Sequence, residues 1–251
     1  MKHDLNETMR LQRAHRSIRR YRPDPIPRET LETLIRCGQA ASTSSFIQAY
    51  SIVRVTDPEH RKAIAEAAGG QPWIIEAPEF LIFCADLRRI DRACRKAGEE
   101  PLEGMSEHAL VAIIDVSLMA QNLFLAAESL GLGGVYIGGI RNDDPRVVVD
   151  CLRLPRQVLP VFGMCLGRPR EEPKQPIRPR MPVDLILHNG QYHDATDTGL
   201  AAYDETTADY YRARPQNPKT TVWSTEIAQA VQGKKREHMS AFLHERGFFR
   251  K

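Results

Sequence analysis

The longest apolar segment of the chain, residues 106–130, predicts one long helix. Ser106 suits the N-cap and Gly131 the C-terminal stop, because serine bonds free amide groups and glycine adopts left-handed backbone. Residues spaced three or four apart form the predicted apolar face: Leu110, Ile114, Leu118, Gln121 and Leu125. Ile113, Val116, Met119 and Phe124 widen it nearly all round the helix. We therefore expect burial on most sides, in a core or across a subunit interface.

The rest of the chain alternates between helical and strand patterns. Apolar or β-branched runs predict strands over residues 50–55, 79–86, 158–167 and 183–188. Apolar periodicity predicts helices over residues 4–19, 28–38, 58–68 and 142–154, and within 199–251. Residues 87–105 are rich in charge and poor in apolar side chains. We expect them to form an exposed, partly helical excursion from the core.

The overall charge and the cysteine pattern exclude several classes of protein. Net charge is only +3, from 35 basic and 32 acidic residues, so total charge gives no reason to expect nucleic-acid binding. The five cysteines show no C-x-x-C spacing, which argues against a zinc site or a disulfide framework. We recognise no leader and no membrane-spanning stretch. The expectation is a cytoplasmic protein, with one large domain or a core plus an appendage.

A basic motif near the N-terminus suggests a bound anion. Residues 13–22 contain five arginines, with a histidine, a serine, an isoleucine and a tyrosine among them. Guanidinium and hydroxyl groups in close order suit a phosphate. The motif leads into Pro25-Ile26-Pro27, which forces an extended exit. A solvated helix end or a localisation-like basic run is the plainer interpretation.

A glycine-rich segment at residues 131–141 suggests a close approach to a flat ligand. Two Gly-Gly pairs flank the short apolar run Val135-Tyr136-Ile137. No G-x-G-x-x-G motif enters a helix here, so the Rossmann fingerprint is absent from the sequence. Glycine pairs allow a ring to lie against bare backbone because no Cβ intrudes.

Several ordered motifs together resemble the nitroreductase family of FMN-dependent oxidoreductases. They are His15-Arg16-Ser17-Ile18-Arg19, the Pro-Ile-Pro turn, Tyr136-Ile137-Gly138-Gly139, and the Leu-Pro-x-Phe-Gly-x-Cys-Leu-Gly segment over residues 159–167. The match extends from His15 to the C-terminal region and is most similar to the oxygen-insensitive NADPH nitroreductase and NADPH–flavin oxidoreductase branch.

The resemblance implies a fold and a domain plan. The fold is α+β, with a mostly antiparallel sheet of four or five strands surrounded by helices, in an intertwined homodimer. Residues 1–182 would form the FMN-binding core, with the excursion near 87–105. Residues 183–251 would form a C-terminal extension, a swapped strand plus helices, that wraps the partner subunit.

The resemblance also assigns residues to the flavin. FMN-contacting residues would be His15, Arg16, Ser17, Arg19, Thr43, Ser44, Ser45, Gln48, Gln71, Tyr136, Ile137, Gly138, Gly139, Arg178 and Arg180. The glycine segment would offer a backbone N–H to flavin N5, and Arg19 would tune the flavin. Arg178-Pro179-Arg180 departs from the Lys-Pro-Arg of typical relatives, which keeps the charge but changes the donors. We call residues 42–48 the hydroxyl loop, because four hydroxyl residues precede Phe46 there. For this loop and for Gln71, an ordinary loop remains an alternative.

The implied reaction is hydride transfer from NADPH via flavin N5 to nitroaromatics, quinones or free flavin, by a ping-pong mechanism. Chemistry at N5 requires no catalytic side chain. Phe46, Arg141, Arg214 and Arg236 would contact NADPH or substrate, although each arginine also suits a solvated surface. Histidines other than His15, among them His238, are expected at the surface. Alternatives are a flavin reductase that supplies a monooxygenase, a non-catalytic flavin-binding protein, and a nucleic-acid-binding protein.

Overall fold

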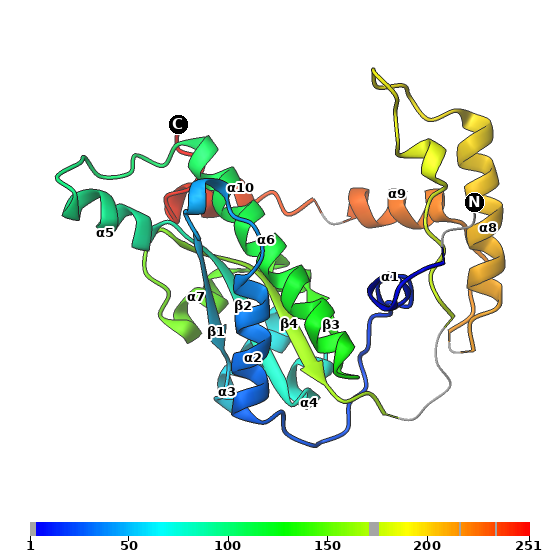
Figure 1. Cartoon of the computed structure of the whole chain (residues 1–251), viewed down its shortest axis with the longest axis horizontal. Coiled ribbons are helices and arrows are strands. Elements are labelled where there is room, and N and C mark those ends of the chain that lie inside the picture. The colour runs from blue at the N-terminus through cyan, green and yellow to red at the C-terminus, as the bar shows by residue number, and fades with distance from the viewer. Residues whose placement is uncertain (1–3, 171–175, 216, 234) are drawn as a thin grey trace. The chain divides into compact units, whose positions relative to one another are not determined.

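The computed structural model describes residues 4–170, 176–215, 217–233 and 235–251, and they divide into two compact units (Figure 1). The core unit contains residues 4–13, 17–170 and 236–251. The C-terminal unit contains residues 176–215, 217–233 and 235, together with residues 14–16 from the arginine motif. Each unit is described by itself.

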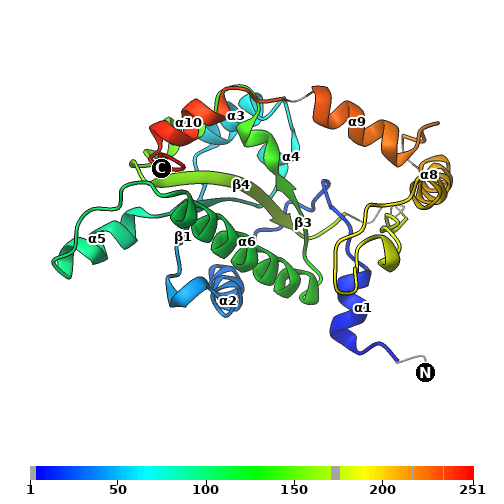
Figure 2. The same ribbon diagram turned by 90° about the horizontal axis from the view of Figure 1, so that it is seen from above.

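The core unit is built on a four-stranded antiparallel sheet in the order β1-β2-β4-β3. The strands are β1 (Tyr50–Arg54), β2 (Glu79–Asp86), β3 (Gly133–Ile137) and β4 (Val158–Gly167). Every residue of β2 is buried, as its continuous apolar run predicts. Figure 2 shows α2 (Arg28–Gln39) and α6 (Ser106–Ser129) on one face, with α3 (Pro58–Ala67), α4 (Trp73–Glu76) and α10 (Met239–Glu245) on the other. The predicted α+β class and antiparallel sheet are confirmed.

A bulge interrupts the pairing of the two central strands. Phe83 pairs with Phe162, but the next residue, Cys84, pairs with Pro160, so Val161 is the extra residue of β4. Proline lacks the N–H that a regular ladder needs, which explains an irregularity at this place. The carbonyl group of Val161 is thereby available to a side chain.

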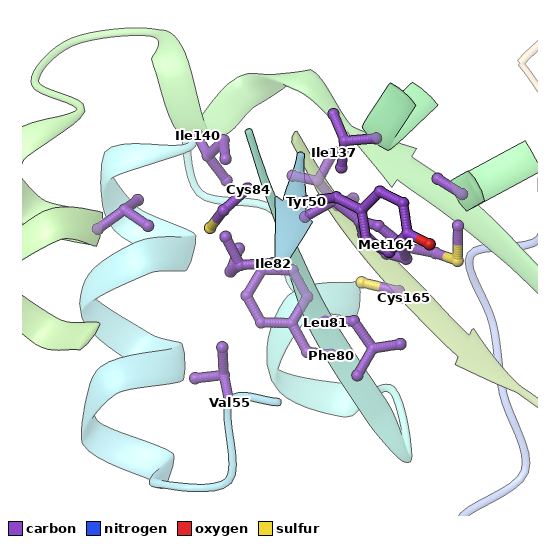
Figure 3. Packing of buried hydrophobic residues seen from close by; sticks show 14 of the residues in the cluster. Tyr50, Val55, Phe80, Leu81, Ile82, Cys84, Ile137, Ile140, Met164 and Cys165 are labelled. Carbon is purple, nitrogen blue, oxygen red and sulfur yellow. The ribbon is translucent and has the colours of Figure 1, made fainter. Parts of the chain in front are cut away.

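The core around the sheet is apolar, and it includes two cysteines. Figure 3 shows Cys84 and Cys165 among Phe80, Ile82 and other buried side chains. Burial raises the pKa of the Cys84 thiol to about 12, with the Asp86 charge adding to the effect. Both cysteines therefore act as small apolar groups, as their sequence context predicts.

The long helix α6 is confirmed, but its core face differs from the predicted one. The buried residues include Ala109, Ala112, Val116 and Leu123. Small side chains on this face allow close packing, and a Cβ at Gly38 of α2 would lie 2.7 Å from Met119 Cε. On the opposite face, Leu110, Ile114 and Leu118 are 48%, 54% and 47% exposed. Periodicity identified the helix, whereas the buried face was decided by close approach to α2 and the sheet.

The ends of α6 match the sequence prediction at one end only. Gly131 follows the helix with φ +72°, the left-handed conformation expected of a C-terminal stop. At the other end Met105 occupies the N-cap, and Ser106 is the first helical residue. The Ser106 hydroxyl donates to the Lys251 carbonyl oxygen at 2.8 Å, so it ties the helix start to the C-terminus of the chain.

The same helix corrects the expectation that no stretch is long enough to span a membrane. Among the described residues α6 alone has the length and hydropathy of a spanning helix, by those criteria only. Its buried alanine face packs against the sheet, which is the arrangement of a core helix.

Three further elements differ from their predicted bounds or type. The first helix, α1 (Glu7–Arg13), ends at the first residue of the arginine motif and does not continue to residue 19, because Ile18 N–H bonds to Gly134 of β3 instead. Helix α7 (Arg146–Leu152) is shorter than residues 142–154, and Pro145 lies at its N-cap. The strand predicted over residues 183–188 is replaced in this chain by a 3₁₀ turn, Val183–Leu185.

The remaining helices lie in the excursion and in the C-terminal unit. The excursion contains α5 (Arg88–Lys96), as expected of a partly helical segment. The C-terminal unit contains α8 (Asp197–Arg212) and α9 (Trp223–Gly233). The buried Thr207 hydroxyl accepts from Trp223 N–H at 2.9 Å, and Asp204 accepts from Ser224 N–H at 2.9 Å. These bonds fix the start of α9 on α8.

Candidate functional site

The arginine motif continues as an extended segment beside the edge strand β3. Ser17 forms a parallel bridge with Gly134, and Ile18 N–H donates to the Gly134 carbonyl oxygen at 2.7 Å. A Cβ at Gly133 would lie 2.6 Å from Ile18 Cγ1, so only glycine permits this approach. The glycine-rich strand therefore positions the motif that precedes it by more than a hundred residues.

The far end of the same segment is held by residues that follow β4. Tyr21 bridges Pro169, and its buried hydroxyl donates to the Ile18 carbonyl oxygen at 2.6 Å. Arg170 Nε donates to the Tyr21 carbonyl oxygen at 2.8 Å. Burial raises the pKa of Tyr21, so its hydroxyl stays a donor. The backbone of residues 17–22 is thus fixed from both ends.

Arg19, Gln71 and the glycine turn lie together at the end of β3. The guanidinium carbon of Arg19 lies 5.5 Å from the ring centroid of Trp73, a cation–π contact. Trp73 Nε1 donates to Gln71 Oε1 at 3.0 Å, and Gln71 Nε2 donates to the Ala68 carbonyl oxygen at 2.7 Å. A Cβ at Gly139 would lie 2.3 Å from Gln71 Nε2. The structure therefore brings together three of the residues that the sequence singled out.

The end of β3 presents backbone rather than side chains. The Tyr136 ring stacks on Phe124 at 5.3 Å and meets the edge of Phe162 at 5.2 Å, and burial raises its pKa. Tyr136 is half-buried, and Ile137 is buried. Gly138 and Gly139 then open the 3₁₀ turn Gly138–Arg141. A ligand at this turn would meet main-chain groups, as the glycine pattern predicts.

The hydroxyl loop is held by a carboxylate that sequence analysis missed. Asp115 of α6, only 1% exposed, accepts from Ser44 N–H at 3.0 Å and from Ala49 N–H at 3.1 Å. Between these anchors Ser45, Phe46 and Gln48 have φ values of 47°, 58° and 55°. The Phe46 side chain is 82% exposed. A carboxylate in the middle of an apolar helix was the available signal.

Thr43, Ser44, Ser45 and Gln48 are thus presented on one tight turn. Thr43 precedes the 3₁₀ turn Ser44–Phe46, and the Gln48 amide nitrogen donates to the Phe46 carbonyl oxygen at 3.4 Å. Left-handed backbone at three non-glycine residues is costly and is retained where the surroundings fix it. Asp115 supplies that restraint.

Arg141 and Arg236 lie close together at the glycine turn. Arg141 Nη1 donates to the carbonyl oxygen of Val161 at the β4 bulge. Arg236 Nη2 donates to Asn142 Oδ1 at 2.7 Å and approaches the Gly138 carbonyl oxygen at 3.4 Å. Burial, and secondly the Arg236 charge, lowers the pKa of Arg141. Two partly desolvated cations beside one turn favour an anionic ligand.

Two neighbours of these arginines were not recognised from the sequence. Asn142 orients Arg236, and His238 lies 3.2 Å from the Arg141 carbonyl oxygen through its Nε2 atom. The expectation that His238 is an unpartnered surface group is therefore wrong. Its partner, Arg141, is distant along the chain, so no local sequence pattern indicates the contact.

The other predicted arginines lie in the C-terminal unit, and His15 and Arg16 belong to that same unit. The Tyr203 hydroxyl of α8 donates to the Pro179 carbonyl oxygen at 3.1 Å, which fixes the Arg-Pro-Arg segment. Burial raises the pKa of Tyr203, and the charges of Arg180 and Arg178 oppose this effect. Arg214 Nε is buried and has no hydrogen-bond partner within the part of the chain that the structure describes.

Comparison with known proteins assigns the chain to a family. Residues 13–168 match the model described as "Nitroreductase family", and residues 178–251 match "Nitroreductase family, C-terminal domain". The chain belongs to the nitroreductase family.

Similarity to individual family members extends over nearly the whole chain. The chain is 40% identical to the oxygen-insensitive NADPH nitroreductase of Salmonella typhimurium, covering 97% of this chain and 99% of the relative. It is 39% identical to the FMN reductase (NADPH) of Bacillus subtilis, covering 97% and 99%. The solved structure of the NADPH:FMN oxidoreductase from Vibrio harveyi complexed with NAD+ superposes with a TM-score of 0.87, at 38% identity, covering 98% and 100%. The predicted family and its branch are confirmed.

Proposed function

We propose that this nitroreductase is an FMN-dependent enzyme that uses NADPH to reduce nitroaromatics, quinones or free flavin. The observation that carries the proposal is the cluster of Arg19, Gln71 and the Gly138–Gly139 turn at the end of β3. The relatives' names, an NADPH nitroreductase and an NADPH-dependent FMN reductase, supply the cofactor and the electron donor.

The donor set fits a flavin mononucleotide. A turn without Cβ atoms suits a flat ring, and Gln71 with the hydroxyl loop offers neutral donors and acceptors for ring edges and a ribityl chain. Arg16, Arg178 and Arg180 belong to one compact unit and suit a terminal phosphate. FMN, when bound, supplies the two-electron redox chemistry between NADPH and the acceptor.

The chain's own residues orient and stabilise the cofactor. Arg16, Arg178 and Arg180 bind the phosphate, with His15 and Ser17 beside Arg16 in the chain. Thr43, Ser44, Ser45 and Gln48 contact the ribityl chain and the ring edge. Arg19, held over Trp73, offsets the negative charge that the ring gains on reduction. Tyr136 and Ile137 contribute backbone, because their side chains are turned inward.

Arg141, Arg236 and Arg214 bind the phosphates of NADPH, and Phe46 offers an exposed ring for a flat substrate. Bringing an anion to Arg141 and Arg236 relieves the mutual repulsion of two partly buried cations. The buried Nε atoms of Arg236 and Arg214 lack partners among the described residues, which leaves donors for a ligand. NADPH and the acceptor use the site in turn, which gives ping-pong kinetics.

The enzyme acts as a homodimer. Leu110, Ile114 and Leu118 form an exposed apolar face on α6. Four apolar or aromatic side chains of the C-terminal unit are between 63% and 74% exposed: Val183, Ile186, Leu187 and Tyr192. They lie in the extension that is expected to wrap the partner subunit. Apolar surface of this kind marks an interface. Light scattering should give the mass of a dimer, and Leu118→Asp with Ile114→Asp should shift the mass toward 28.4 kDa. A monomeric wild-type protein would contradict this part.

The cytoplasm is the proposed compartment. All five cysteines are free, and disulfides do not accumulate in a reducing environment. This compartment also supplies NADPH.

A flavin reductase that supplies reduced FMN to a monooxygenase is the second candidate, favoured by the name of the Bacillus subtilis relative. The two functions differ in the acceptor that is used best. Steady-state kinetics should vary NADPH at fixed concentrations of a nitroaromatic, and then of free FMN. Parallel double-reciprocal lines support the ping-pong order. A flavin-containing protein that never oxidises NADPH would instead be a non-catalytic flavin-binding protein.

A further inference from the structure

A cavity of about 520 Å³ lies at the excursion of the core unit, and arginines dominate its walls. Helix α5 contributes Arg88, Arg92 and Arg95, at positions i, i+4 and i+7, so one helical face carries all three. Arg156 comes from the segment before β4, and Arg250 comes from the C-terminus. None of the residues assigned to FMN or NADPH lines this cavity.

The cavity contains one carboxylate, and it is already engaged. Asp91 is buried, and it accepts from Arg95 Nε at 2.8 Å and from Leu102 N–H at 2.8 Å. The Arg95 hydrogen bond is the main reason that the pKa of Asp91 lies below its usual value, so Asp91 stays ionised and paired. One negative charge therefore faces five positive ones.

The other four cavity arginines lack such compensation. Within the described ranges, no hydrogen bond or ion pair involves the guanidinium groups of Arg88, Arg92, Arg156 or Arg250. Several arginines elsewhere in the core unit are paired with a carboxylate, for example Arg28 with Glu32 and Arg146 with Glu245. Like charges gathered in a hollow repel one another unless an anion enters. This local excess exceeds the net charge of the whole chain, +3.

The walls of the cavity are fixed by backbone bonds. Gly104 and Gly247 have φ values of +84° and +89°, and a Cβ at Gly104 would lie 2.9 Å from the Gly247 carbonyl oxygen. Arg250 N–H donates to the Gly104 carbonyl oxygen at 2.8 Å, and Gln157 N–H donates to the Arg246 carbonyl oxygen at 2.8 Å. The guanidinium of buried Arg246 donates to the Leu154 carbonyl oxygen at 2.9 Å. Arg156 and Arg250 therefore lie on backbone segments that these hydrogen bonds hold in place.

We infer that this cavity binds a small polyphosphate, a molecule with two or more linked phosphate groups. Guanidinium groups bind phosphate oxygens in pairs, and four uncompensated ones exceed what a single phosphate can neutralise. The volume lies within the usual range for small-molecule sites, roughly 300–1,000 Å³. The site goes beyond the proposed redox function, because its residues belong to neither cofactor.

Calorimetric titration of the flavin-loaded full-length protein tests the inference, with inorganic orthophosphate, pyrophosphate and tripolyphosphate as probes. Affinity should rise with each added phosphate and fall steeply with salt. The double variant Arg92→Gln, Arg156→Gln should bind tripolyphosphate at least about tenfold more weakly. The reason is that loss of one charged hydrogen bond raises Kd by about tenfold or more. Arg28→Gln is the matched control, because Arg28 is an exposed arginine outside the cavity, and it should bind as the wild type does.

Three further readouts separate loss of this site from loss of the redox function or of the fold. The double variant should keep its flavin content and its kcat/KM for NADPH, and its Tm should not fall, because the removed groups have no partner to lose. The inference is overturned if the wild type shows no saturable binding, or if tripolyphosphate binds the double variant as tightly as the control. It is also overturned if only Arg214→Ala weakens the probe, which would place the phosphates at the NADPH arginines.

Discussion

The core unit uses arginines in two opposite ways. At the glycine turn Arg141 and Arg236 are held by Val161 and Asn142, and Arg19 is held over Trp73. At the cavity, Arg95 is paired with Asp91. The guanidinium groups of the other four cavity arginines have no such restraint among the residues that the structure describes. A restrained guanidinium gives a ligand a fixed direction, whereas an unrestrained group gives mainly positive potential. The first arrangement suits recognition of one cofactor, and the second suits a flexible polyanion.

Loss of the arginines proposed to bind the FMN phosphate should have the largest effect. Arg16→Ala with Arg180→Ala should yield a colourless protein that regains flavin absorbance only with excess FMN, because the phosphate loses two charged donors. Flavin content after desalting is the measurement. The matched control is Arg92→Ala with Arg156→Ala, two cavity arginines, which should stay yellow. Equal flavin content in both double variants would remove the distinction between the two groups.

Arg214→Ala should have the next largest effect. A charged hydrogen bond contributes about 1.5–3 kcal/mol, so kcat/KM for NADPH should fall roughly ten- to a hundred-fold. NADH lacks the 2′-phosphate and should be used almost as before. Steady-state kinetics with both donors decides the matter. Equal losses would give Arg214 a structural role, and no loss would show that Arg214 does not bind the 2′-phosphate.

Asp91→Asn should destabilise the core unit in a pH-dependent way. The folded pKa of Asp91 is lowered, chiefly by Arg95, so its stabilisation is fully present above the usual aspartate pKa and is lost as pH falls through the lowered value. At neutral pH the variant should lose about 1–3 kcal/mol of unfolding free energy, through weaker hydrogen bonds to Arg95 and Leu102. Urea unfolding at neutral and strongly acidic pH measures both limits. If the loss of unfolding free energy in Asp91→Asn is as large in acid as at neutral pH, the effect comes from packing and not from the charge of Asp91.

Arg19→Ala should give the smallest effect, on the flavin potential. Removing a cation from the reduced ring lowers its two-electron potential, and about 30 mV corresponds to 1.4 kcal/mol. A shift of roughly that size is expected, and a potential titration against a reference dye resolves it. Arg92→Ala, from the cavity group, should leave the potential unchanged. An unaltered potential in Arg19→Ala would show that Trp73 holds this arginine for packing alone.

Elements with local patterns could be predicted from the sequence, and elements decided by distant contacts could not. The continuous apolar run of β2 and the glycines around β3 can be recognised from composition alone. The end of α1 at Arg13 depends on Gly134, and the buried face of α6 depends on the fit of Gly38 against Met119. Sequence period shows that a helix has an apolar stripe, but the partner surface decides which stripe is covered.

The candidate site shows the same division. Arg19 and the Gly138–Gly139 turn can be proposed from the sequence because they lie in motifs, and Gln71 can be proposed only through the family resemblance. Asp115 escaped notice because its partners are the backbone amides of a loop on another element. The basic cavity escaped notice because its arginines come from three segments, 88–95, 156 and 250. The excursion was recognised as charged, but nothing in one segment indicates a cavity closed by two others.

The absorption spectrum of the purified protein, before and after anaerobic addition of NADPH, tests the central claim most directly. We predict a yellow protein with the two visible bands of bound flavin, and bleaching of the longer-wavelength band by one equivalent of NADPH per flavin. Air or a nitroaromatic should restore the colour. A colourless protein that takes up no FMN, or a yellow one that NADPH does not bleach, would contradict the account.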